Sequence, residues 1–176
     1  HTDSLTGLLN RRGFSESIQP KLEAKQNIVI FYIDLDGFKM INDSLGHRIG
    51  DLVLQQVATR LMALEFAALE CCRFGGDEFV IVLPDTNRGL DINEIAASII
   101  NTLSIPYEDD HGSLLTISAS LGVVRCPDDS RDLTELIRFA DAAMYCSKKQ
   151  GKKRYTIHCW YGKRNSAQKQ CNAALK

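Results

Sequence analysis

The 176-residue chain has almost no net charge, since 21 lysine and arginine residues stand against 22 aspartate and glutamate residues. A chain with a formal net charge of -1 has no overall positive field that would attract nucleic acid or an acidic membrane surface. It also lacks an apolar run of the roughly 20 residues that a membrane-spanning helix needs. We therefore expect no nucleic-acid partner and no membrane contact by this segment.

The six cysteines lack the C-x-x-C spacing that is typical of metal sites. We expect all six to be reduced thiols that serve mainly as packing residues, as in cytoplasmic proteins. No signal-peptide pattern opens the chain, which also favours a cytoplasmic localisation. The chain begins without Met, so a longer protein that contains it can still be anchored in a membrane by an upstream segment.

The apolar patterns predict an alternation of helices and strands. Residues 27–36 are a continuous β-rich run, which predicts a buried strand. Two short β-rich segments flank a Gly-Gly-Asp-Glu stretch and predict a hairpin that ends at Pro84. Helical spacing predicts helices over residues 51–64, 90–103 and 132–150. Further strands are expected over residues 114–126 and 153–158. Gly122 allows a bulge in the first of these two strands. With a first helix before residue 27, this order predicts an α+β fold with a mostly antiparallel central sheet flanked by helices.

Four acids stand where the predicted strands end. Asp34 and Asp36 are two residues apart, so they share one face of the strand. Asp77 and Glu78 lie at the tip of the predicted hairpin. If the two strands are neighbours, these carboxylates converge and repel one another unless protons or cations neutralise them. Oxygen ligands suit Mg²⁺, which usually also binds substrate phosphates; the alternative is a set of solvated acids at strand ends.

Lysines crowd the end of the last predicted helix. Lys148 and Lys152 are four residues apart, so we expect them to share a helix face. Acids for a metal and a pair of lysines together favour a nucleoside triphosphate as the ligand, and Gly37 would let backbone N–H groups approach its phosphates. The alternative is that the lysines complement the helix dipole. The chain has no P-loop sequence.

The stretch "KMINDSLGHRIGD" (residues 39–51) carries polar side chains between apolar ones. An Asn42 amide can donate to O6 or N7 of guanine, and an Asp51 carboxylate can accept from its N1–H and N2–H₂ groups. We also include His47 among the predicted substrate-binding residues, although a single histidine in such a stretch is more often structural.

Together these stretches closely resemble the GGDEF family, the diguanylate cyclases. Five ordered motifs carry the resemblance: "DSLTGLLNRR" (3–12), "YIDLDGFKMINDSLGHRIGD" (32–51), "RFGGDEF" (73–79), "SLG" (120–122) and "ADAAMYCSKKQGKK" (140–153). The resemblance implies a GGDEF domain over residues 1–160, with residues 161–176 as a C-terminal tail or truncated linker. It also implies a fold similar to the catalytic domains of palm-type nucleotide cyclases.

The resemblance implies that two GTP molecules condense to cyclic di-GMP with release of pyrophosphate. The reaction needs Mg²⁺, with Mn²⁺ as a substitute, and a homodimer, because one domain holds one GTP and two phosphodiester bonds are made. We expect an upstream sensor domain in the full-length protein, and a downstream domain is a further option.

By the family pattern, Asp34 and Glu78 hold the metal by their carboxylates and Leu35 by its carbonyl. Asp77 and Glu78 are the expected catalytic residues, with Asp77 beside the reacting 3′-hydroxyl as candidate general base, or at least as an electrostatic helper. The remaining substrate-binding residues are Gly37 and Phe38 by their N–H groups, Asn42, His47 and Asp51 around guanine, and Lys148 and Lys152 on the phosphates.

The chain departs from the family pattern at two places. Lys152 stands where the family usually has arginine, which removes a bidentate fork. Many members carry an R-x-x-D product site shortly before the signature, and the matching positions here are Phe66, Ala67, Ala68 and Leu69. We therefore expect no feedback inhibition through that site.

Two other functions fit the sequence. One is a catalytically silent GTP-binding module that regulates an adjacent domain, for example a phosphodiesterase. The other is a cyclase that uses other nucleotides, which the guanine-reading residues disfavour.

Overall fold

The computed structural model describes residues 1–159. Its central sheet has five strands in the order β2 (Glu70–Gly75), β3 (Glu78–Pro84), β1 (Ile28–Asp36), β6 (Ser118–Cys126) and β7 (Tyr155–Ile157). Neighbouring strands are antiparallel, except that β6 and β7 are parallel. A separate two-stranded ribbon consists of β4 (Tyr107–Glu108) and β5 (Leu114–Leu115). The predicted α+β fold with a mostly antiparallel central sheet is confirmed.

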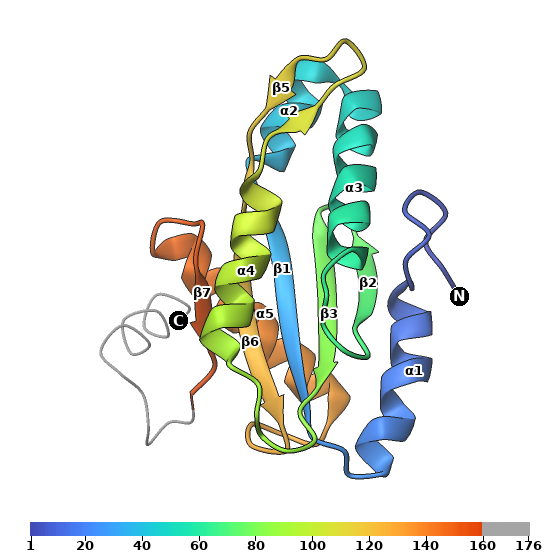
Figure 1. Cartoon of the computed structure of the whole chain (residues 1–176), viewed down its shortest axis with the longest axis vertical. Helices are drawn as coiled ribbons and strands as arrows, with labels where there is room; N and C mark the ends of the chain where they lie inside the picture. Colours follow the sequence, from blue (N-terminus) through green and yellow to red (C-terminus); the bar gives the residue numbers. More distant parts are fainter. Residues whose placement is uncertain (160–176) are drawn as a thin grey trace.

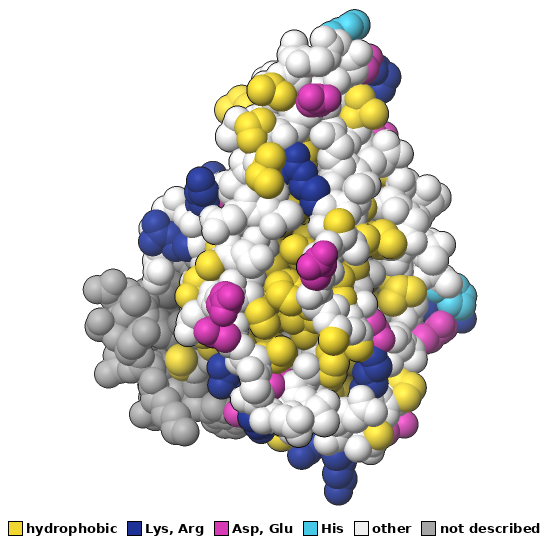
Figure 2. Space-filling view, in the orientation of Figure 1, with side chains coloured by type: hydrophobic (Ala, Val, Ile, Leu, Met, Phe, Trp, Pro, Cys, Tyr) yellow, Lys and Arg dark blue, Asp and Glu magenta, His cyan; other side chains and the backbone are white. Residues whose placement is uncertain are grey.

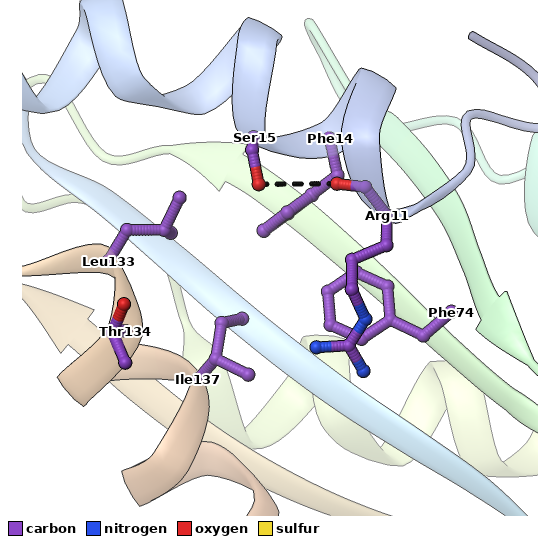
Figure 3. A pocket seen from close by; sticks show the side chains of 7 residues that line it. All are labelled: Arg11, Phe14, Ser15, Phe74, Leu133, Thr134 and Ile137. Carbon is purple, nitrogen blue, oxygen red and sulfur yellow. Dashed lines mark hydrogen bonds between the residues drawn. The ribbon is translucent and has the colours of Figure 1, made fainter.

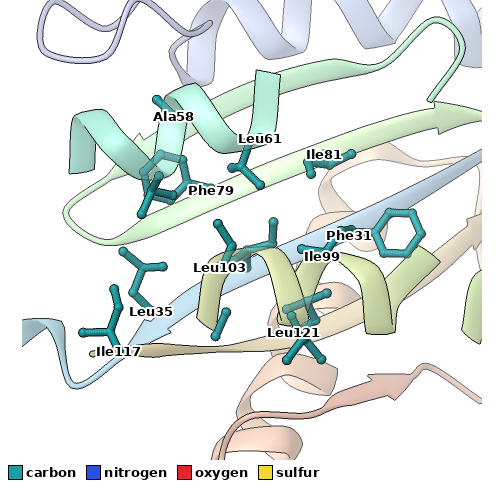
Figure 4. Packing of buried hydrophobic residues seen from close by; sticks show 14 of the residues in the cluster. Phe31, Leu35, Ala58, Leu61, Phe79, Ile81, Ile99, Leu103, Ile117 and Leu121 are labelled. Carbon is teal, nitrogen blue, oxygen red and sulfur yellow. The ribbon is translucent and has the colours of Figure 1, made fainter. Parts of the chain in front are cut away.

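Helices cover both faces of the sheet (Figure 1). On one face lie α3 (His47–Met62) and α4 (Ile92–Ser104), and on the other lie α1 (Arg11–Glu23) and α5 (Leu133–Lys149). Side chains alternate along β1, so Phe31 packs with α3 and α4, whereas Ile30 packs with α1 and α5. Figure 4 shows the core beneath α3 and α4. A central strand buried on both faces explains the continuous apolar run of residues 28–33.

The region after β1 contains one more helix than we predicted. The short helix α2 (Phe38–Leu45) comes first, and α3 then begins at His47, so Gly50 lies within α3. Gly46, with a φ of 90°, separates them because few other residues adopt that conformation. Asn42, Asp43 and Ser44 are weak helix formers, which is why helical propensity did not indicate α2.

Gly122 is not at a bulge, which corrects that expectation. The pairing of β6 with β1 is continuous from Cys126 to Ser118. A Cβ atom at Gly122 would lie 2.0 Å from the Ala140 carbonyl oxygen and 2.3 Å from the Met144 nitrogen. The glycine therefore lets α5 pack directly on the sheet, and α5 carries Lys148 to the end of β1.

The cysteines only partly follow the prediction. Cys71, Cys72, Cys126 and Cys159 are free thiols, as expected. Cys146 is disulfide-bonded, so the prediction of six reduced thiols is wrong for it. Spacing along the chain did not indicate this, because it does not tell which sulfur atoms meet in space. Cys171 lies outside the described residues, as does the predicted tail from residue 161.

Within residues 1–159, no helix is both long and apolar enough to cross a membrane.

Candidate active site

The end of β1 and the start of β3 bring the predicted acids together. Asp34 is paired directly opposite Glu78 in the antiparallel ladder. Asp77 lies in the hairpin turn, where its carbonyl accepts a hydrogen bond from the Leu35 N–H at 3.2 Å. Arg73 holds this turn by donating to the Gly76 carbonyl at 2.9 Å. The prediction that the two strands are neighbours and that their acids converge is therefore confirmed.

Asp34 has a perturbed ionisation. Burial, together with the negative charge of Asp77, raises the pKa of the Asp34 carboxyl to about 6, although Lys148 acts in the opposite direction. The ionised form of Asp34 is thus disfavoured by its surroundings, and a nearby cation would stabilise it.

Lys148 supplies a positive charge at this point. Its ammonium nitrogen lies 3.1 Å from the Asp34 Oδ1 atom and 2.7 Å from the Asp36 Oδ1 atom. It also donates to the Leu35 carbonyl oxygen at 3.2 Å. Two residues that the family pattern gives as metal ligands therefore already direct oxygen atoms toward one cation.

Asp36, unlike Asp34, is surrounded by several hydrogen-bond donors. Its carboxylate accepts hydrogen bonds from the Ser118 hydroxyl (2.6 Å), the Ser120 hydroxyl (2.7 Å) and the Lys153 N–H (3.1 Å), besides that from Lys148. Burial alone would raise the pKa of Asp36, but these donors hold it below the usual value. Asp36 therefore joins β1, β6 and the segment after α5, a role that its spacing from Asp34 did not reveal.

The oxygen atoms at the end of β1 fit a hard divalent cation. The donors would be the carboxylates of Asp34 and Glu78 and the carbonyl of Leu35, all of which are oxygen ligands. Among the described residues, no three His, Cys, Asp or Glu side chains form a metal-holding group. A Mg²⁺ ion here would therefore complete its coordination with water and substrate phosphates, as this ion commonly does.

Asn42 and Asp51 lie on α2 and α3, two helices that pack against each other. The Asn42 Oδ1 atom is buried and has no hydrogen-bond partner within the described part of the chain. A Cβ atom at Gly50 would lie 1.9 Å from this oxygen, so Asn42 lies directly against the residue that precedes Asp51. Asp51 and His47 are exposed in the first turns of α3. The exposed Asp51 carboxylate can accept N–H groups from a ligand.

The expected phosphate-binding groups lie at two helix ends. Gly37, with a φ of 82°, precedes α2, and Phe38 is its first residue. Free N–H groups at such an N-terminus can bind an anion. The prediction that Lys148 and Lys152 share a helix face is wrong, because α5 ends at Lys149. Lys152 lies exposed in the turn that follows α5 and has a φ of 65°. Gly151 just before it has a φ of 120°, which is outside the helical range, so the helix does not reach Lys152.

The positions that match the family's product site carry no charge. Phe66 and Leu69 are partly buried and pack against the core beneath α3 and α4. Figure 2 shows hydrophobic side chains gathered between these two helices, while the basic side chains on the same face are scattered. A hollow of about 370 Å³ there is lined by Phe66, Leu83, Pro84 and Leu90, among others.

Comparison with known proteins shows to which family the chain belongs. The model of the family described as "Diguanylate cyclase, GGDEF domain" matches residues 1–154, so the chain belongs to the GGDEF family. Signaling protein YkoW of Bacillus subtilis is 39% identical over 163 residues, which are 90% of this chain and 20% of YkoW. The bifunctional diguanylate cyclase/cyclic di-GMP phosphodiesterase MucR of Pseudomonas aeruginosa is 37% identical over 157 residues, which are 87% of this chain and 23% of MucR.

A solved structure has the same fold. The GGDEF domain of TpbB (also YfiN) from Pseudomonas aeruginosa superimposes with a TM-score of 0.82 at 34% sequence identity, covering 90% of this chain and 95% of that one. The chain thus spans nearly all of an isolated GGDEF domain, but about a fifth of the length of YkoW and MucR.

Proposed function

We propose that this chain is a Mg²⁺-dependent diguanylate cyclase domain that condenses two GTP molecules into cyclic di-GMP as a homodimer. The observation that carries the proposal is the convergence of Asp34, Asp77 and Glu78 beside Lys148 at the end of β1. The family match supports the same reaction. Mn²⁺ is the expected substitute for Mg²⁺, since both accept oxygen ligands.

In this proposal each residue has a defined task. Asp34, Glu78 and the Leu35 carbonyl would hold the metal. A bound Mg²⁺ would lower the cost of deprotonating a hydroxyl and stabilise charge on phosphate. Asp77 lies next to Asp34 and accepts the proton of the 3′-hydroxyl. Gly37 and Phe38 donate N–H groups to the phosphates, and Lys148 and Lys152 stabilise the charge that builds on the departing pyrophosphate.

We place the guanine base against the junction of α2 and α3. The Asn42 amide donates to O6 or N7 of guanine, and the Asp51 carboxylate accepts its N1–H and N2–H₂ groups. The exposed His47 lines the same junction. One domain binds one GTP by these residues, so two domains must face each other to form both phosphodiester bonds.

The test is product formation. The chain is fused to a dimerising coiled coil and incubated with GTP and Mg²⁺, and products are separated by chromatography and identified by mass. We expect cyclic di-GMP and two pyrophosphates for each product molecule. GTP binding without any product, despite enforced dimerisation, would contradict the enzyme proposal.

That contrary outcome would favour a second function, a catalytically silent GTP-binding module that regulates a neighbouring domain. The observation in its favour is that MucR, whose name includes both a cyclase and a phosphodiesterase activity, is about four times as long as the matched segment. For either function we propose a longer signalling protein with an upstream sensor domain and this domain in the cytoplasm.

Asp51→Ala is expected to weaken GTP binding about tenfold, because one good contact to a base edge is worth roughly 1–3 kcal/mol. The turnover rate at saturating GTP should change less than the affinity. Binding is measured by calorimetry with GTP and with ATP, and selectivity for GTP should fall. Asp43→Ala is the matched control, since Asp43 is also an exposed acid in this region. Unchanged GTP affinity in Asp51→Ala would refute the guanine-binding role.

Product inhibition through residues 66–69 is expected to be absent. A guanidinium and a carboxylate would be needed to bind the product's phosphates and guanine edges there, whereas Phe66 and Leu69 pack on the core. Cyclic di-GMP added to the assay should cause no inhibition that depends on these positions. Saturable binding of cyclic di-GMP that disappears in Phe66→Ala or Leu69→Ala would contradict this expectation.

A further inference from the structure

Tyr32 lies beside the acids but is not among the proposed metal-binding, catalytic or substrate-binding residues. It precedes Asp34 by two residues on β1 and therefore shares the strand face of Asp34. In the ladder, Tyr32 is opposite Val80 and Asp34 is opposite Glu78, so Glu78 is the diagonal neighbour of Tyr32. The Tyr32 hydroxyl donates a hydrogen bond to the Glu78 Oε2 atom at 2.9 Å.

The Tyr32 ring is held in place by its neighbours. It is only 3% exposed and meets the Phe74 ring edge-on, with centroids 5.8 Å apart and an interplanar angle of 88°. Phe74 in turn meets Phe14 edge-on at 5.1 Å. Such contacts restrict the tyrosine ring, so its hydroxyl is directed at a fixed point.

The outer side of Phe74 is also covered. The Arg11 guanidinium lies 4.3 Å from the Phe74 ring centroid. Figure 3 shows Arg11 and Phe74 at the wall of a cavity between α1 and α5. This cavity has a volume of about 160 Å³. Phe74 therefore lies between this cavity and Tyr32. The Arg11 guanidinium packs on Phe74, and Phe74 packs on Tyr32.

Glu78 needs such a donor because of its position opposite Asp34. Like charges directly opposite each other in a sheet repel. Asp34 has Lys148 as its partner, and Lys148 also pairs with Asp36. A hydrogen bond at Oε2 compensates part of the negative charge of Glu78 and fixes the plane of its carboxylate, which leaves the Oε1 atom for another ligand.

We propose that Tyr32 is a positioning residue that orients the Glu78 carboxylate for binding the divalent cation. The inference deepens the proposed function, since it rests on Glu78 as a metal ligand. It does not require turnover, because metal binding can be measured on its own.

The test compares the chain with Tyr32→Phe, which removes the hydroxyl and keeps the ring. Mn²⁺ binding is followed by electron paramagnetic resonance in the presence of a GTP analogue with a methylene group between the α- and β-phosphates. We expect the Mn²⁺ dissociation constant to rise about tenfold, the lower end of the effect of removing a group that orients a metal ligand. The Mg²⁺ concentration for half-maximal velocity should rise by a similar factor, with a smaller change in kcat at saturating Mg²⁺.

Tyr107→Phe is the matched control. Tyr107 is fully buried, and its hydroxyl donates to the Leu103 carbonyl at 2.7 Å, away from the acids. Its removal should lower stability and leave Mn²⁺ binding unchanged. In a Glu78→Gln background, Tyr32→Phe should have little further effect on Mn²⁺ binding, since the two residues act through one contact.

Equal Mn²⁺ affinity in the parent and Tyr32→Phe would overturn the inference, as would equal weakening in Tyr107→Phe. The enzyme proposal has a separate readout, which is product formation by the parent. A parent that makes no product but loses Mn²⁺ affinity on Tyr32→Phe would refute turnover and retain the role of Tyr32.

Discussion

Glu78→Ala is expected to reduce cyclic di-GMP formation by at least about 1,000-fold while the chain stays folded. Removing a carboxylate ligand costs several kcal/mol of transition-state stabilisation, and each 1.36 kcal/mol is a factor of ten in rate. The fold should survive because Glu78 is half-buried at the first position of β3 and does not belong to the hydrophobic core clusters. Product is measured by chromatography with mass detection, and folding by circular dichroism.

Two further variants define what Glu78 contributes. Glu78→Gln keeps the shape and the hydrogen-bond acceptor for Tyr32 but removes the charge, so it should be nearly as inactive as Glu78→Ala. Glu94→Ala is the control for loss of an acid elsewhere, since Glu94 is exposed in the first turn of α4, and its activity should equal that of the parent. Substantial activity in Glu78→Gln would show that charge at this position is dispensable and would overturn the assignment as a metal ligand.

The main features of the site could be predicted from the sequence because they depend on local periodicity. Asp34 lies near the end of an apolar strand, and Asp77 and Glu78 follow a pair of glycines, so their approach required only that β1 and β3 be neighbours. The hairpin and helix α5 were predictable for the same reason, because alternation and capping residues are local signals. Asp132 indeed caps α5 by accepting from the Glu135 N–H.

The contacts that distinguish one acid from another could not be predicted in this way. Tyr32 reads as one more apolar residue of a buried strand, and only the register reveals its bond to Glu78. Ser118 and Ser120 are more than eighty residues from Asp36, and nothing local connects them. Lys152 followed helical spacing, but the helix ends three residues earlier, since helix ends are the least predictable part of such patterns.

Lys148→Met is expected to lower the free energy of unfolding by about 2–3 kcal/mol at pH 7. Removing one partner of a buried ion pair typically costs 3–5 kcal/mol. We expect the lower end or less because Asp36, which is only 5% exposed, keeps its bonds to Ser118, Ser120 and the Lys153 N–H. Stability is measured by urea unfolding of the parent and the variant.

The pH dependence of this loss follows from the ionisation of Asp36. Its pKa is lowered in the folded chain, so its ion pair adds stability that is present above the usual aspartate pKa of 3.8 and is lost as the pH falls through the folded value. The pKa of Lys148 is raised, because the attraction of Asp36 and Asp34 outweighs its burial, so the lysine stays charged through neutral pH. The difference between parent and Lys148→Met should therefore be largest near neutral pH and shrink below about pH 4.

Lys148 has two proposed roles, in the ion pairs with Asp34 and Asp36 and in phosphate binding, and two control variants separate them. Lys149→Met removes an exposed neighbouring lysine and should change stability by less than about 0.5 kcal/mol. Lys148→Arg keeps a positive charge near Asp36, so it should restore most of the stability even where GTP binding stays weak. If Lys148→Met were as stable as the parent yet bound GTP poorly, the ion pairs with Asp34 and Asp36 would contribute nothing, and Lys148 would act on the phosphates alone.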